Sequence, residues 1–176
     1  MRRVAVVGAS AAGKSTLARA MAERLGVPHL ELDSLYHQAG WTALPRPEFR
    51  ARVTEFQQND GWVIDGNYTS HVGDLVLAAA DTVVWLRMPR RLVLRQVLRR
   101  TGLRMLSRQP LWNGNKESLR NVLSRDPERS IVTWAWVMHD KYDEQYEALA
   151  ASSPNQRWIV LRSRADVRDF LAGTAD

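Results

Sequence analysis

Residues 4–16 read VAVVGASAAGKST, a short apolar run followed at once by a glycine-rich turn and a lysine. Gly8, Gly13, Lys14 and Ser15 satisfy the pattern G-x-x-x-x-G-K-[ST], which functions after a strand and at the start of a helix. The glycines let the backbone N–H groups turn toward phosphate oxygens. The lysine reaches the β and γ phosphates, and the serine hydroxyl coordinates Mg²⁺. The stretch therefore predicts a site for ATP and Mg²⁺.

The phosphate-binding part should extend through the whole turn and into the helix that begins at Lys14, because a helix N-terminus attracts anions. We expect Lys14 to act in catalysis as well as in binding. The residues expected to bind the nucleotide here are Gly8, Ala9, Ser10, Ala11, Ala12, Gly13, Lys14, Ser15 and Thr16.

Five short apolar runs alternate with helical patterns along the 176 residues. Strands that alternate with helices pair in parallel and are covered on both faces, which predicts a three-layer α/β/α domain. Gly26 is placed to end the first helix, and Gly102 to end a later one. The expected strands are 4–8, 29–33, 62–66, 81–86 and 157–161, and the expected helices are 14–25, one near Pro47, 90–100, 126–152 and 165–171.

Two aspartates follow strands of the predicted sheet. Asp33 ends the run HLELD and Asp65 ends WVID. The carboxyl ends of parallel strands lie at one edge of the sheet, the edge where the phosphate turn also lies. We expect Asp65 to hold Mg²⁺ together with Ser15. We expect Asp33 to accept the proton of an attacking hydroxyl or to orient the acceptor. These roles predict a kinase.

Five segments, taken in order, resemble one group of proteins: GASAAGKST, ELDSLYHQAGW, WVIDGNY, VVWLRMPRRLVLRQVLRR and LWNGNKESL. They resemble the adenylate-kinase-like small kinases, and more closely the adenylate kinase-related kinases also described as DNA topology modulation proteins. The resemblance implies a P-loop NTPase fold with a five-stranded parallel sheet in the order 2-3-1-4-5. Within a single domain, residues 1–176, it implies an acceptor-binding insertion at about 34–60 and an arginine-rich helical lid at about 95–129.

The same resemblance assigns individual residues. Asp65-Gly66 resembles the Asp-Gly that closes the third strand in nucleotide kinases, and Arg95 and Arg99 resemble the paired arginines at the start of the lid. One helical turn apart, two guanidinium groups can bind phosphate oxygens together. A second lid pair is left open among Arg104, Arg108, Arg120, Arg125 and Arg129. By analogy of fold, Arg162 lies in the loop near the adenine.

The acceptor side is expected around residues 33–41 and 66–68. Asp33 with His37 is similar to an Asp-x-x-x-His arrangement in some sugar-acid kinases, and aromatic rings could stack on a base or sugar. The expected acceptor-binding residues are Asp33, Tyr36, His37, Trp41, Gly66, Asn67 and Tyr68.

The arginine-rich stretch 90–108, RRLVLRQVLRRTGLRMLSR, contains seven arginines and no acidic residue. Its arginines could fold over ATP as a lid, follow a nucleic-acid backbone, or form a solvated basic face. The lid interpretation is favoured because the stretch follows the fourth strand of a P-loop fold. No aromatic side chains that could stack on bases are interleaved with the arginines.

We therefore predict an ATP-dependent kinase that acts on a nucleoside, a nucleotide or a similar small hydroxyl compound. A sugar-acid kinase of the gluconate or shikimate type and a nucleotide-dependent nucleic-acid-binding regulator are the alternatives. The expected partner is a small molecule, without nucleic acid or membrane, and the expected state is a monomer or homodimer. The absence of cysteine, of a signal peptide and of a long apolar run favours the cytoplasm.

Overall fold

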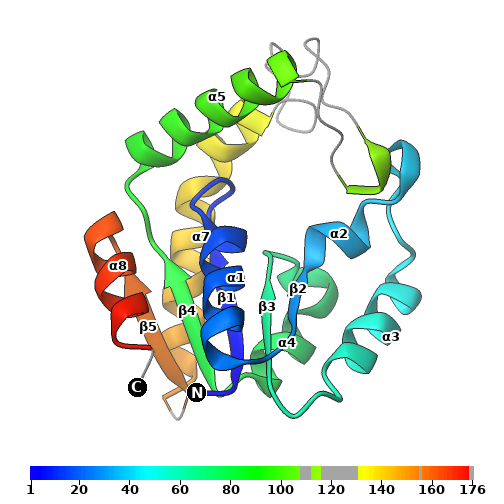
Figure 1. The fold of residues 1–176 in the computed structure, drawn as a ribbon, viewed down its shortest axis with the longest axis vertical. Coiled ribbons are helices and arrows are strands. Elements are labelled where there is room, and N and C mark those ends of the chain that lie inside the picture. Colours follow the sequence, from blue (N-terminus) through cyan, green and yellow to red (C-terminus); the bar gives the residue numbers. More distant parts are fainter. Residues whose placement is uncertain (108–111, 116–130, 155, 175–176) are drawn as a thin grey trace.

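The computed structural model describes residues 1–107, 112–115, 131–154 and 156–174. It contains a five-stranded parallel sheet in the order β2-β3-β1-β4-β5, which confirms the expected topology (Figure 1). The central strands are buried along almost their whole length, as expected for a parallel sheet covered on both faces. The strands are β1 (Arg3–Gly8), β2 (His29–Glu31), β3 (Trp62–Asp65), β4 (Thr82–Leu86) and β5 (Arg157–Leu161).

The helices connect these strands and extend beyond their carboxyl ends. Gly26 ends the first helix in a left-handed conformation, with φ of 63°, as its position predicts. The helices are α1 (Lys14–Leu25), α2 (Leu32–Tyr36), α3 (Arg46–Phe56), α4 (Asp74–Ala79), α5 (Arg90–Ser107), α7 (Ile131–Ser152) and α8 (Arg164–Ala172). Three shorter helical turns are η1 (Ala39–Trp41), η2 (Thr69–Gly73) and η3 (Trp112–Gly114).

The core is divided by the sheet, because successive side chains of a strand point to opposite faces. Val4 and Val6 of β1 pack with α1, with the first half of α5 and with partly buried residues of α8. Ala5 and Val7 pack on the other face, with residues of α3, α4 and α7. The two clusters give the three layers that the alternation of strands and helices predicted.

The expected second strand is too long. It ends at Glu31, and Asp33 lies in the first turn of α2 instead of at the strand end. The chain turns here because Leu32 packs against the loop after β3, where a Cβ on Gly66 would lie 2.8 Å from the Leu32 Cβ. The Ser34 hydroxyl also donates to the Glu31 carbonyl at 2.7 Å. Glu31 is therefore the carboxylate that pairs in register with Asp65.

Gly102 does not end the arginine-rich helix, which continues to Ser107. A glycine inside a helix costs only about 1 kcal/mol relative to alanine, so it does not by itself break one. Val93 and Val97 are buried as expected, whereas Leu98, placed by its spacing on the apolar face, is 57% exposed. The buried face of this helix is therefore narrower than its pattern indicates.

Within the described ranges, none of the helices combines the length and apolar character that crossing a bilayer requires.

Candidate active site

The turn after β1 has the backbone conformation that a phosphate loop requires. Gly8 has φ of 139°, and a Cβ there would lie 2.5 Å from the Leu86 carbonyl oxygen of β4. Ala11 and Gly13 also have positive φ, of 59° and 103°. Left-handed residues interspersed in a turn direct successive N–H groups to one side, which forms a concave anion site. The loop thus fits a triphosphate at the N-terminus of α1.

Lys14 lies within this loop. Its Nζ donates to the carbonyl oxygens of Gly8 at 3.0 Å and Ala9 at 3.1 Å. Burial lowers the pKa of Lys14, and the charge of Arg100 on α5 lowers it further. The charges of three carboxylates oppose this shift and raise the pKa of Lys14: Asp33, Asp65 and Glu31.

Asn67 binds the first residue of the phosphate loop. Its Nδ2 donates to the Gly8 carbonyl at 2.6 Å, and its Oδ1 accepts from the Gly8 N–H at 3.3 Å. Tyr146 of α7, which is fully buried, donates its hydroxyl to the same Oδ1 at 3.0 Å. The sequence indicated an acceptor-binding role for Asn67, and in the structure its amide binds the first residue of the phosphate loop.

Oxygen atoms converge on Ser15 from two strands. The Ser15 hydroxyl lies 2.8 Å from Glu31 Oε1 and 3.0 Å from Asp65 Oδ1. His29 Nε2 lies 2.7 Å from the other oxygen of Asp65, which is 2% exposed. A hydroxyl and two carboxylates are the hard oxygen ligands that Mg²⁺ prefers, so this set fits the ion that accompanies ATP.

Glu31 is a residue that the sequence interpretation missed. The available signal was a charged, weakly β-forming residue within the apolar run HLELD, two positions before the aspartate that drew attention. Among the described residues, no group of three or more histidine, cysteine, aspartate or glutamate side chains could hold a metal by itself.

Asp33 belongs to a hydrogen-bonded group on the acceptor side. Its Oδ1 accepts from the Tyr68 hydroxyl at 2.7 Å, and that hydroxyl lies 3.3 Å from His37 Nε2. Burial raises the pKa of Tyr68 above its usual range, and the adjacent Asp33 charge raises it further. Burial lowers the pKa of His37, and the Asp33 charge opposes that shift. Tyr68 thus remains a hydroxyl donor next to the carboxylate.

Aromatic rings surround this group. Tyr36 contacts the rings of His37 and Tyr68, with centroids 5.2 and 4.7 Å apart. His37 also contacts the ring of Trp41 at 5.4 Å, and Trp41 is 43% exposed. The structure therefore brings together Asp33, Tyr36, His37, Trp41 and Tyr68, as the sequence predicted.

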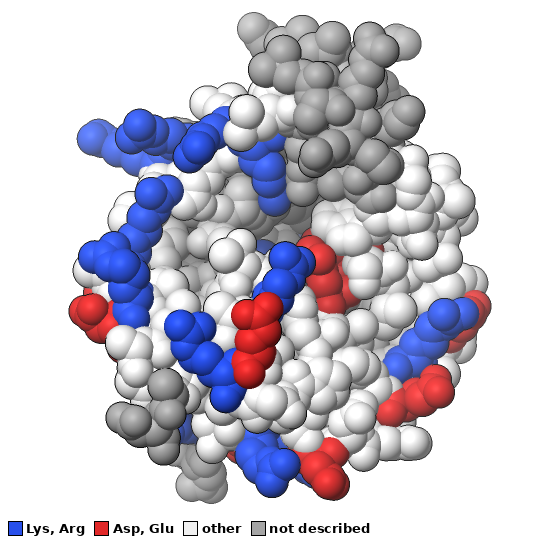
Figure 2. Space-filling view, in the orientation of Figure 1, with Lys and Arg blue, Asp and Glu red and all other residues white. Residues whose placement is uncertain are grey.

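Several arginines of the sequence-predicted lid lie on α5. Figure 2 shows Lys and Arg side chains gathered over this helix, beside a hollow in the surface. Arg95 and Arg99 are exposed on α5, and Arg100 is the arginine whose charge acts on Lys14. Arg162 is exposed in the loop after β5. The side chain of Arg104 and the whole of Arg108, Arg120, Arg125 and Arg129 lie outside what the structure describes.

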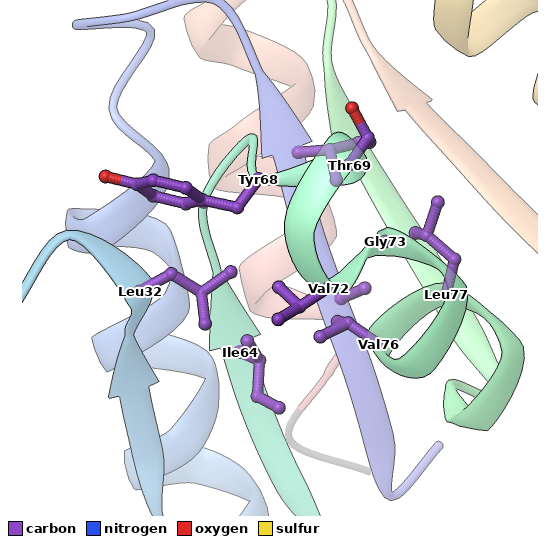
Figure 3. A pocket seen from close by; sticks show the side chains of 11 residues that line it. Leu32, Ile64, Tyr68, Thr69, Val72, Gly73, Val76 and Leu77 are labelled. Carbon is purple, nitrogen blue, oxygen red and sulfur yellow. The ribbon is translucent and has the colours of Figure 1, made fainter. Parts of the chain in front are cut away.

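A small cavity of about 20 Å³ lies in the core below the acceptor side. Figure 3 shows Val72, Val76 and Leu32 pointing into it, while the Tyr68 ring borders it and the hydroxyl points away. A cavity needs roughly 10–15 Å³ to hold one water molecule, so this cavity has room for about one water and is too small for a substrate. It is a packing defect behind the site.

Comparison with known proteins gives one partial sequence match. A cytidylate kinase from Streptococcus thermophilus is 30% identical over 80 residues, which are 42% of this chain and 35% of that protein. The match thus covers only about a third of the relative's length. No protein-family model matches the chain.

Solved structures match over nearly the whole chain. A shikimate kinase from Acinetobacter baumannii in complex with shikimate has a TM-score of 0.58 and 18% identity, over 98% of this chain and 90% of its own. A deoxyadenosine kinase from M. mycoides has a TM-score of 0.56 and 14% identity, over 96% of this chain and 94% of its own. A gluconokinase from Sinorhizobium meliloti 1021 has a TM-score of 0.56 and 18% identity, over 99% of this chain and 91% of its own. The chain therefore has the fold of small P-loop kinases. The narrower resemblance to DNA topology modulation proteins stays a prediction.

Proposed function

We propose that this protein is an ATP-dependent kinase that transfers the γ-phosphoryl group to a hydroxyl of a nucleoside, a nucleotide or a similar small compound. The observation that carries the proposal is the arrangement around Ser15 and Lys14. The phosphate loop meets carboxylates from β2, α2 and β3 within hydrogen-bonding or electrostatic range. Phosphoryl transfer depends on positioning and on charge stabilisation, and these groups supply both.

The loop N–H groups and Lys14 hold the β and γ phosphates. Ser15, Glu31 and Asp65 would hold Mg²⁺, which supplies positive charge next to the triphosphate oxygens when bound. The acceptor oxygen forms a bond to the γ phosphorus while the bond between this phosphorus and the bridging β oxygen breaks. The hydroxyl proton passes to Asp33, which Tyr68 holds in place. The products are ADP and the phosphorylated acceptor.

The lid is expected at residues 95–129, and its described part on α5 would cover the nucleotide. Residues 113 and 115 of the same range contact the acceptor segment, residues 34–60, while 108–111 and 116–129 lie outside the described residues. In this proposal Arg95 and Arg99 neutralise charge on the phosphoryl group during transfer. The basic surface of α5 in Figure 2 supports this role. Arg162 would border the adenine.

A sugar-acid kinase is the second candidate. The observation that favours it is the hydrogen-bonded group of Asp33, Tyr68 and His37, which places a proton acceptor and a ring nitrogen where a polyhydroxylated acceptor would bind. Asp33→Asn separates a nucleoside monophosphate, which often needs no strong base, from a nucleoside or sugar-acid hydroxyl, which does. The choice between a nucleoside and a sugar acid rests on which acceptor is labelled.

The test is transfer of labelled γ-phosphate from Mg·ATP to nucleosides, nucleoside monophosphates and sugar acids. Lys14→Ala is the blank, and Lys141→Ala is its matched control because Lys141 is exposed on α7. We expect a labelled product that is lost only in Lys14→Ala. ATP binding without any labelled acceptor, together with DNA binding that weakens steeply with salt, would instead support the nucleic-acid-binding regulator.

A further inference from the structure

Trp41 has an unusual backbone conformation for a large side chain. Its φ is 60°, and the preceding Gly40 is also left-handed, with φ of 70°. Bulky residues rarely adopt positive φ, and such strained positions cluster at ligand-binding sites because the surrounding structure must enforce them. Trp41 is nevertheless 43% exposed, so its strain does not serve to bury the ring.

Asn115 enforces this conformation from 74 positions further along the chain. Its Oδ1 accepts from the Trp41 N–H at 3.0 Å, and its Nδ2 donates to the Gln38 carbonyl at 2.9 Å. Asn115 is 5% exposed, so both ends of a buried amide are used on this one turn. Leaving a buried amide without hydrogen-bond partners destabilises the fold, so Asn115 favours the one turn conformation that satisfies it.

The neighbouring residues of the same segment bind the rest of the turn. Asn113 Nδ2 donates to the His37 carbonyl at 2.6 Å and lies 3.3 Å from the Ser34 carbonyl. The Trp112 ring lies over the His37 ring, with centroids 5.7 Å apart and planes 24° apart. The ring of Trp41 meets the same histidine edge-on. Two tryptophans from distant segments therefore flank one histidine.

This aromatic surface is connected to the proposed proton acceptor. His37 Nε2 lies 3.3 Å from the Tyr68 hydroxyl, which donates to Asp33 at 2.7 Å. A ligand resting on the tryptophans would therefore lie beside the carboxylate that we assign to the acceptor hydroxyl. Aromatic faces bind flat rings by stacking, and every base presents such a face.

We propose that residues 112–115 form the outer half of the acceptor site. Trp112 and Trp41 are specificity-determining residues that stack on a planar heteroaromatic ring, and Asn115 is the positioning residue that holds Trp41 in its strained conformation. The ligand class is a nucleoside, a flat base attached to a hydroxyl-bearing sugar. This inference rests on the proposed function and narrows its substrate class.

The test uses the full chain and two readouts. The first is calorimetric binding of adenosine, cytidine, guanosine and thymidine without ATP. The second is kcat and KM for the best acceptor, together with KM for ATP. We expect Trp41→Ala and Trp112→Ala each to weaken nucleoside binding about 10-fold to 100-fold, the range of losing one stacked base. Trp41→Phe, which keeps a ring, should recover most of that loss.

Matched controls separate these effects from general destabilisation. Trp136→Ala removes a tryptophan of α7 that is 52% exposed, and it should leave nucleoside binding unchanged. Asn115→Ala should raise the acceptor KM while leaving KM for ATP unchanged. Asn59→Ala, which removes an exposed turn asparagine, should change neither.

The outcomes distinguish this inference from the proposed function. Suppose that both tryptophan variants lose nucleoside binding and that the wild type transfers no phosphate. This result would support base stacking on Trp41 and Trp112 and would argue against the kinase reaction. The wild type could instead transfer phosphate to gluconate or shikimate, with the same activity in Trp41→Ala and Trp112→Ala. This result would overturn base stacking on the two tryptophans and would still support a kinase. Nucleoside affinity that is equal in the wild type and both variants would also overturn base stacking.

Discussion

Asn67 binds both backbone polar groups of Gly8, accepting from its N–H at 3.3 Å and donating to its carbonyl at 2.6 Å. Gly8 is the last residue of β1 and Asn67 lies in the loop after β3, and these two strands are adjacent in the sheet. Tyr146 completes the contact from α7. The first residue of the phosphate loop is thus fixed by an amide that is itself fixed by the core, which limits the conformations the loop can adopt.

Asn67→Ala should therefore affect ATP more than the acceptor. We expect KM for ATP to rise about tenfold and the free energy of unfolding to fall by about 1–3 kcal/mol, because Gly8 and Tyr146 lose their partner. Steady-state kinetics and urea unfolding measure the two effects. A larger rise in the acceptor KM than in KM for ATP would contradict this assignment and restore the acceptor role that the sequence indicated.

Glu31→Gln should weaken the response to Mg²⁺. The change keeps the shape of the side chain and removes one charge beside Ser15, so we expect the Mg²⁺ concentration for half-maximal activity to rise roughly 10-fold to 100-fold. A Mg²⁺ titration at fixed ATP measures it. Glu48→Gln is the control, because Glu48 lies on the exposed surface of α3 and its carboxylate forms an ion pair with Arg52 of the same helix. An unchanged Mg²⁺ response in Glu31→Gln would remove Glu31 from the site.

Arg95→Ala and Arg99→Ala test the lid. If these side chains close over the phosphates, each variant should lower kcat by about 10-fold to 1,000-fold, because charge stabilisation of the transferring group is lost. Arg91→Ala, on the same exposed face and one turn earlier, is the control and should retain wild-type kcat. If kcat is the same in all three variants, the arginines of this face form a solvated surface and not a lid.

His37 should make stability depend on pH. Burial lowers its pKa below the usual 6.5, so between that lowered pKa and 6.5 the unfolded chain binds more protons than the folded chain. The free energy of unfolding should therefore fall as the pH drops through this window. Urea unfolding between about pH 5 and pH 7.5 should show a flatter profile for His37→Asn than for the wild type. His71→Asn, which keeps His37, should retain the wild-type slope, and an equal flattening in both variants would contradict the assignment.

Val76→Ile should stabilise the protein by filling the cavity below Tyr68. One added methylene contributes about 0.8 kcal/mol when it is buried without strain. Thermal or urea unfolding measures the change. Val63→Ile is the matched control, because Val63 is fully buried in β3 and does not line the cavity, so overpacking there should destabilise. Equal destabilisation in both variants would mean that the cavity cannot accept a methylene.

Local features of the chain were predictable from its sequence. The phosphate loop, the burial of the central strands and the end of α1 at Gly26 depend on dihedral preferences and on the period of apolar residues within a short window. Gly102 misled the same reasoning, because the cost of a glycine within a helix is small beside the packing of Val93 and Val97.

The partners in the site were decided by the tertiary structure. Glu31 joins the expected Asp65 beside Ser15 because β2 ends where Leu32 packs under Gly66, a contact between residues 34 positions apart. Asn67 meets Gly8 because β1 and β3 are neighbours, and Asn115 meets Trp41 across 74 positions. A sequence shows which groups can donate and accept hydrogen bonds. Which donor meets which acceptor depends on strand order and on where each strand ends, and both are set by packing across the whole domain.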